Sequence, residues 1–162
     1  MKQIAVIFVG NKLMQDEGIG PAAYVMLKER YIVPDNVQLF EVGCMSLDMI
    51  PLVEKCDVII TVDAVDGTDE EPGTIFTFSP EDMARHSGAM ASLHDLKLVD
   101  LFDAATLLGY EAEGLCLGMQ VYCMEPPEYV LELSEPCAEK LPLLVDIIVG
   151  ELRRYGVDCQ ER

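Results

Sequence analysis

Basic residues are scarce in this sequence. The chain of 162 residues carries 29 acidic residues against 11 lysines and arginines, a formal net charge of −18. A chain this acidic is repelled by phosphate backbones, which argues against a nucleic-acid partner. The same charge keeps a protein in solution and attracts basic protein surfaces or metal cations.

Long apolar runs and processing signals are also lacking. No apolar run reaches the roughly 20 residues that a membrane-spanning helix requires. Lys2 leads directly into strand-like sequence without a small-residue cleavage site, so no signal peptide is expected. We therefore expect a cytoplasmic protein without a membrane span.

Paired metal-binding cysteines and common catalytic motifs are missing as well. None of the six cysteines forms a CxxC pair, so we expect reduced and mostly buried thiols rather than a zinc or iron–sulfur site. The GxGxxG and GxxxxGK[ST] motifs of nucleotide-binding folds are absent, which argues against an organic cofactor. Without a Gly-x-Ser-x-Gly elbow, serine or cysteine protease chemistry is disfavoured.

The sequence does contain a regular alternation of strand-like and helix-like segments. Hydrophobic residues make up 51% of the chain, enough for a packed core. Strands are expected at residues 4–9, 37–42, 58–62, 74–78 (antiparallel to the rest) and 115–124, and helices at 21–31, 45–54, 92–108 and 134–155. The alternation predicts a single domain over residues 1–162, a three-layer α/β/α fold with a mostly parallel sheet of about five strands. Pro142 is expected to kink the last helix or to mark where it begins.

The loop between the first strand and the first helix is the most informative stretch. It holds three glycines and the adjacent acids Asp16 and Glu17. A loop that leaves the carboxyl end of a strand in an open α/β sheet lines the crevice where ligands bind. Acids there disfavour phosphate and favour a cation, so one of the two is expected to face the crevice while the other forms the turn.

Only two histidines are present, His86 and His94. His94 begins an expected helix, where the helix dipole disfavours the imidazolium form and leaves the neutral ring available as a ligand or base. A local hydrogen bond would explain His94 equally well. His86 lies in the irregular stretch at residues 79–91.

One further acid is well placed. Asp63 directly follows the near-continuous apolar run of residues 58–62 and is expected at the end of the third strand, with Asp66 as its competitor. Convergence of Glu17, Asp63 and His94 would form a mixed oxygen and nitrogen site for a divalent transition metal. The same three groups would also serve as an acid–base set for hydrolysis.

A family resemblance rests on these same residues. The segments Val9-Gly10-Asn11, Asp16-Glu17-Gly18-Ile19-Gly20, Val62-Asp63-Ala64 and Ser92-Leu93-His94 resemble the hydrogenase maturation endopeptidases, and the similarity extends along nearly the whole chain. The resemblance implies removal of a C-terminal extension from the large-subunit precursor of a nickel–iron hydrogenase after nickel insertion.

The resemblance also implies roles for single residues. Glu17, Asp63 and His94 would bind nickel that the substrate supplies, and Glu17 and Asp63 would act in aspartic-type or metal-assisted hydrolysis.

The loops at residues 68–91 and 125–133 are expected to set substrate specificity, because they are loops near the proposed crevice. The alternative is a non-enzymatic nickel-binding accessory or chaperone protein for a nickel enzyme precursor, which would use the same three ligands.

Overall fold

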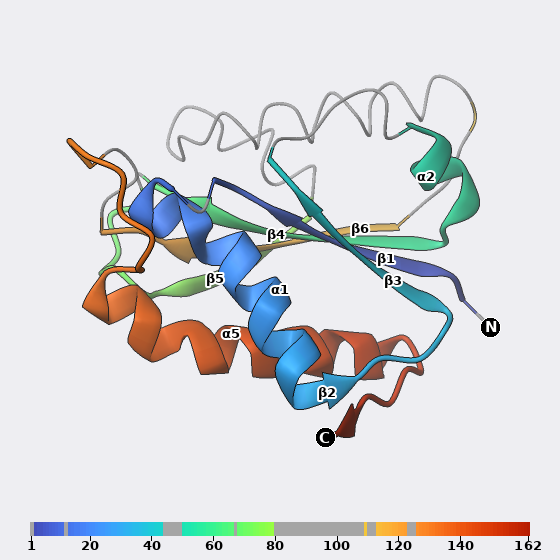
Figure 1. The fold of residues 1–162 in the computed structure, drawn as a ribbon. Helices are drawn as coiled ribbons and strands as arrows, with labels where there is room; N and C mark the ends of the chain where they lie inside the picture. The colour runs from blue at the N-terminus through green and yellow to red at the C-terminus, as the bar shows by residue number, and fades with distance from the viewer. Residues whose placement is uncertain are drawn as a thin grey trace.

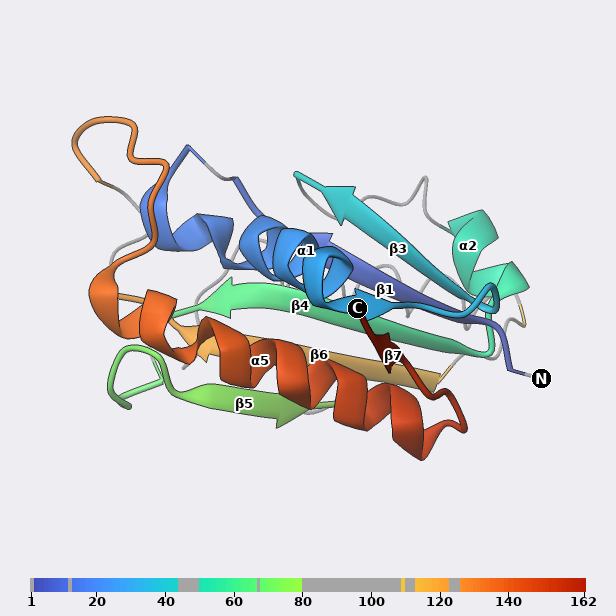
Figure 2. The same cartoon turned by 60° about the horizontal axis from the view of Figure 1, so that its bottom comes forward.

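A five-stranded sheet forms the centre of the computed structural model, which describes residues 2–11, 13–43, 50–66, 68–79, 109, 113–122 and 126–162. The strands, in their order across the sheet, are β3 (Val37–Val42), β1 (Ile4–Val9), β4 (Val58–Val65), β6 (Glu113–Gln120) and β5 (Ile75–Phe78). The first four run parallel and β5 is antiparallel to β6 (Figure 2). The predicted mostly parallel sheet is confirmed, including its antiparallel strand.

Helices lie on both sides of this sheet. Helix α1 (Ile19–Arg30) and helix α5 (Glu135–Arg154) lie side by side against one face, while α2 (Ile50–Lys55) lies on the other side (Figure 1). A short 3₁₀ turn, η1 (Gln15–Gly18), leads into α1. The small strands β2 (Tyr31–Ile32) and β7 (Gln160–Glu161) pair with each other and join the end of α1 to the C-terminal segment.

The central strands are buried on both faces. All six residues of β1 and all eight of β4 are buried, as expected for parallel strands with near-continuous apolar sequence. Alternate residues, such as Val6, Phe8 and Ile60, belong to the core that packs against α1 and α5. The residues between them are fully buried as well, and full burial of one such large apolar side chain stabilises the fold by about 1.5–3 kcal/mol.

Some element boundaries differ from the predicted ones. Strand β4 continues to Val65, so Asp63 lies inside the strand instead of after it. Helix α1 begins at Ile19, which places Pro21 in the first turn, where a missing N–H has no cost because that N–H would have had no intrahelical partner. Helix α5 begins at Glu135 and continues past Pro142, so this proline does not mark its beginning.

Part of the expected organisation lies outside the described residues. This applies to the helix expected at residues 92–108, to the irregular stretch at residues 80–91, and to both His86 and His94. The second half of the helix expected at residues 45–54 is confirmed as α2. None of the described helices combines the length and apolar composition needed to cross a bilayer.

Candidate functional site

The strand order creates a switch point between β1 and β4. From β1 the chain continues through α1 to β3 on one side, whereas from β4 it continues to β5 and β6 on the other side. Two loops that leave neighbouring strands in opposite directions open a crevice at the carboxyl ends of those strands, and ligands of open α/β sheets bind there. A functional site is therefore expected beyond the carboxyl ends of β1 and β4.

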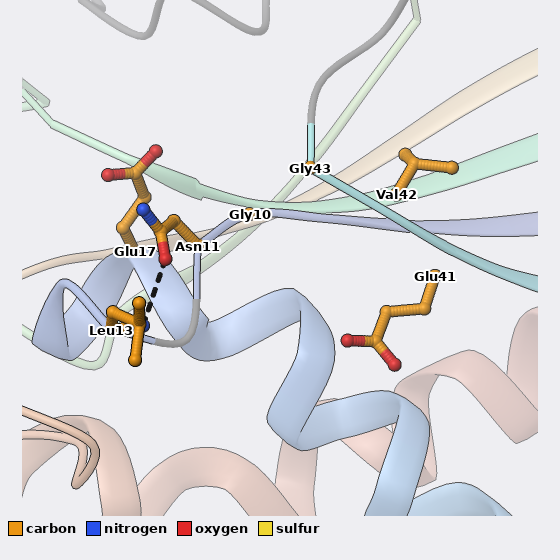
Figure 3. A pocket seen from close by; sticks show the side chains of 7 residues that line it. All are labelled: Gly10, Asn11, Leu13, Glu17, Glu41, Val42 and Gly43. Atoms are coloured by element: carbon orange, nitrogen blue, oxygen red, sulfur yellow. Dashed lines mark hydrogen bonds between the residues drawn. The ribbon is translucent and has the colours of Figure 1, made fainter.

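The two predicted carboxylates both lie near this end of the sheet. Glu17 lies in η1, which follows β1 and lies beside β4. Asp63 is 7% exposed in β4 and faces away from α1 and α5, because its neighbours Val62 and Ala64 face the core beneath those helices. Figure 3 shows the Glu17 side chain extending away from α1. Both acids thus lie toward the carboxyl end of the sheet and face away from α1.

An open pocket of about 400 Å³ borders Glu17 at the ends of β1 and β3. Its lining residues are Gly10, Asn11, Leu13, Glu17, Glu41, Val42 and Gly43 (Figure 3). The Glu17 and Glu41 side chains extend in opposite directions, with Glu41 directed toward the α1 side. Asn11 shapes the loop, since its Oδ1 accepts the Leu13 N–H at 3.0 Å. Glu17 therefore stands at the border of a space that a ligand can enter.

Asp16 is directed into the protein interior and has a different role. It is fully buried, and its Oδ1 accepts the Ser134 N–H at 2.8 Å. Its Oδ2 accepts the Tyr122 N–H and the Ser134 hydroxyl, each at 2.8 Å. These hydrogen bonds offset the cost of removing a carboxylate from water. Asp16 thus connects η1 to the segment between β6 and α5, whereas Glu17 borders the pocket.

Two glycines bring the loop back onto the end of β1. A Cβ atom at Gly20 would lie 2.2 Å from the Val9 carbonyl oxygen, and one at Gly10 would lie 2.0 Å from the Glu17 carbonyl oxygen. Gly10 also has a φ of +144°, which side-chain-bearing residues rarely adopt. The backbone of Glu17 therefore rests directly on Gly10, and only glycine allows this approach.

The acids of β4 and its following loop also differ in their surroundings. The Asp63 Oδ1 accepts the Ala64 N–H at 2.8 Å. Asp66 is exposed, and its Oδ1 accepts a hydrogen bond from Gln120 Nε2 at 3.0 Å. The Gln120 Oε1 accepts bonds from the N–H and the hydroxyl of Thr68. Asp66 therefore helps to organise the loop after β4. Sequence analysis did not identify Gln120, because its partners Thr68 and Asp66 lie more than 50 residues away.

Cys137 lies close to this arrangement but carries no reactive thiolate. Its Sγ donates to the Gln120 carbonyl oxygen at 3.6 Å, and the side chain is fully buried. Burial raises the pKa of the Cys137 thiol above its usual value, so the thiol stays protonated at neutral pH. Cys137 is therefore a buried structural residue.

The complete predicted ligand set is not brought together within the described residues. There, no three His, Cys, Asp or Glu side chains are grouped so as to hold a metal ion. The third predicted ligand, His94, lies outside this part of the chain, as does His86. The two carboxylates supply oxygen donors, and an imidazole would complete a set suited to a transition metal. The ligand set stays a prediction.

Known proteins are similar to this chain along most of its length. A model of the hydrogenase maturation protease family matches residues 22–151. The hydrogenase expression/formation protein HupD of Rhodobacter capsulatus is 31% identical over 159 residues, covering 97% of this chain and 74% of that protein. The hydrogenase 2 maturation protease of Escherichia coli is 29% identical over 161 residues, covering 99% of this chain and 96% of that protein.

A solved structure extends the similarity to three dimensions. The hydrogenase maturating endopeptidase HybD from E. coli superposes with a TM-score of 0.88 at 26% sequence identity, covering 99% of this chain and 98% of that chain. The family match spans most of the sequence, and the mostly parallel sheet agrees with the similar structure. The chain belongs to the hydrogenase maturation protease family and is a hydrolase that cleaves peptide bonds.

Proposed function

We propose that this protease removes the C-terminal extension of a nickel–iron hydrogenase large-subunit precursor, in the cytoplasm, after nickel has been inserted. The observation that supports the proposal is that Glu17 in η1 and Asp63 in β4 both lie toward the carboxyl end of the sheet, near the switch point. Asp16, the adjacent acid, is held in the interior by Tyr122 and Ser134. Two carboxylates thus lie toward an end of the sheet that a protein substrate can approach.

In this proposal the nickel belongs to the substrate. Glu17, Asp63 and His94 bind nickel that is already seated in the precursor, so the metal itself is the signal that the precursor is ready for cleavage. Oxygen and imidazole donors suit a divalent transition metal. Binding brings the nearby scissile bond to the two carboxylates, and a carboxylate or a water polarised by the metal assists hydrolysis. A cation between Glu17 and Asp63 favours both ionised forms and opposes a shared proton of the pepsin type.

Intact-mass spectrometry of the precursor tests this function. The nickel-loaded and the nickel-free large-subunit precursor are each incubated with the enzyme. We expect loss of one discrete C-terminal peptide from the nickel-loaded precursor only. Cleavage of both forms would show that nickel is not the signal. A stable complex that requires nickel, with no change in mass, would favour the accessory-protein alternative.

Single substitutions test the ligand set in the same assay. Glu17→Gln, Asp63→Asn and His94→Ala are expected to lower the cleavage rate by roughly 10²-fold or more, because each removes a charge or donor that acts on the reacting groups. Asp66→Asn is the matched control, since asparagine keeps an oxygen that can accept from Gln120. A comparable loss of activity in Asp66→Asn would show that the wrong one of these two acids has been assigned.

A further inference from the structure

Exposed apolar side chains gather next to the proposed site. Seven large hydrophobic residues are exposed in the described part of the chain. Four of them lie either just before η1 or in the segment between β6 and α5, which is bonded to η1 and to the residues before it. They are Leu13 (37% exposed), Tyr122 (70%), Tyr129 (77%) and Leu131 (70%). Exposed apolar residues that cluster at one place, rather than being scattered singly, indicate an interaction surface.

The two segments are held together by a parallel β-bridge. Met14 pairs with Val130, the Gln15 N–H donates to the Val130 carbonyl oxygen at 2.9 Å, and the Val130 N–H donates to the Leu13 carbonyl oxygen at 2.9 Å. The parallel register places Leu13 beside Tyr129. Figure 2 shows residues 126–133 arching beside the start of η1. The apolar side chains thus stand on a backbone of defined geometry.

The outer edge of this small ladder is available for pairing. Val130 directs its N–H and carbonyl groups toward residues 13–15, and successive groups of an extended chain point to opposite sides, so those of Tyr129 and Leu131 face outward. Among the residues described by the structure, none hydrogen-bonds to the backbone of Tyr129 or Leu131. An open edge flanked by exposed apolar side chains is the arrangement to which an extended peptide adds as a further strand.

This edge is connected to Glu17 by two routes. Leu13, which accepts the Val130 N–H, also lines the pocket that borders Glu17. Asp16, the residue before Glu17, hydrogen-bonds to Tyr122 and Ser134, which lie on either side of residues 126–133 in the sequence. Adjacent strands lie about 4.8 Å apart, so a peptide on the outer edge would lie about two strand spacings, about 10 Å, from the backbone of Leu13.

We propose that the outer edge of residues 129–131 binds an extended segment of the precursor polypeptide beside the scissile bond. That segment carries apolar side chains at alternate positions, which contact Tyr129 and Leu131, together with positive charge. The positive charge is inferred from Glu128 and Glu132, which are exposed on either side of this edge in a chain of net charge −18. The inference rests on the proposed function, because it takes the precursor as the substrate.

A pair of alanine substitutions with a matched control tests the docking edge. The double variant Tyr129→Ala, Leu131→Ala is expected to raise KM for the nickel-loaded precursor at least tenfold with kcat nearly unchanged, and to leave the Tm unchanged because both side chains are exposed. The control Val25→Ala, Leu143→Ala removes equally apolar side chains, 50% and 48% exposed on α1 and α5, and is expected to keep the wild-type KM. An unchanged KM in the first variant, or an equal rise in the control, would overturn the proposal.

The charges on either side of the edge give an independent measurement. Glu128→Gln, Glu132→Gln is expected to raise KM and to make KM less dependent on sodium chloride than in the wild type, because the rim charges act through screened attraction. An unaltered salt dependence would remove the cationic part of the proposal. Failure of the wild-type enzyme to cleave any precursor would instead contradict the proposed function, whereas normal cleavage with a normal KM in the alanine variant would contradict docking alone.

Discussion

At the scale of single residues, two adjacent acids in one short turn have opposite surroundings. Asp16 is fully buried and accepts three hydrogen bonds from Tyr122 and Ser134, whereas Glu17 borders an open pocket. The acidic pair and its position after the first strand are visible in the sequence. The sequence does not show which acid is buried, because the hydrogen-bond donors lie 106 and 118 residues further along the chain.

The pair can be separated by two near-isosteric substitutions. Asp16→Asn places an NH₂ group against N–H donors and is expected to cost about 2–3 kcal/mol of unfolding free energy, with activity falling as the fold weakens. Glu17→Gln is expected to leave the unfolding free energy within about 0.5 kcal/mol of the wild type while cleavage is lost. Urea unfolding combined with the cleavage assay measures both quantities. The assignment fails if Asp16→Asn unfolds at the wild-type urea concentration or if Glu17→Gln is the less stable variant.

At the scale of elements, the connection from β1 to α1 depends on close contacts between backbone segments, which leave no room for a side chain at Gly10 or Gly20. The Glu17 carbonyl lies so close to Gly10 that a Cβ atom there would stand 2.0 Å from it, and Gly20 lies equally close to Val9. The positions of the glycines are visible in the sequence. The need for glycine there is not, because only the folded loop brings Gly10 against Glu17 and Gly20 against Val9. The length of β4 is likewise a result of pairing, since β6 matches it residue by residue as far as Val65.

Alanine substitutions in the pocket test this contact. Gly10→Ala is expected to displace the Glu17 backbone, to destabilise the fold by about 1–3 kcal/mol through overpacking, and to reduce cleavage. Gly43→Ala is the control, because Gly43 lines the same pocket and a Cβ atom there has nothing within 4 Å. Thermal unfolding and cleavage rates of the two variants give the comparison. If both variants kept wild-type stability and activity, the close contact at Gly10 would not be what holds the loop in place.

At the scale of the whole molecule, the net charge of −18 sets the response to salt. Self-repulsion of a highly charged chain destabilises its compact state, and raising sodium chloride from about 10 mM to about 100 mM shortens the Debye length from about 30 Å to about 10 Å. We expect the Tm to rise by about 2–4 °C, the equivalent of roughly 1 kcal/mol. The variant Glu29→Lys, Glu139→Lys, which changes exposed acids on α1 and α5, is expected to show a smaller rise. A Tm that falls with added salt would show that attractive pairs outweigh the repulsion.

The sequence by itself determined the class of fold and the family. A near-continuous apolar run predicts the buried strand Ile4–Val9, and alternation predicts the strand Val37–Val42. Both strands have the predicted bounds, because such patterns depend only on neighbouring residues. Only the tertiary structure decided that Glu17 faces the pocket, that Asp63 faces away from α1, and that residues 129–131 lie beside Leu13. Each of these depends on hydrogen bonds or register between segments far apart in the chain, and no local pattern of residues encodes such contacts.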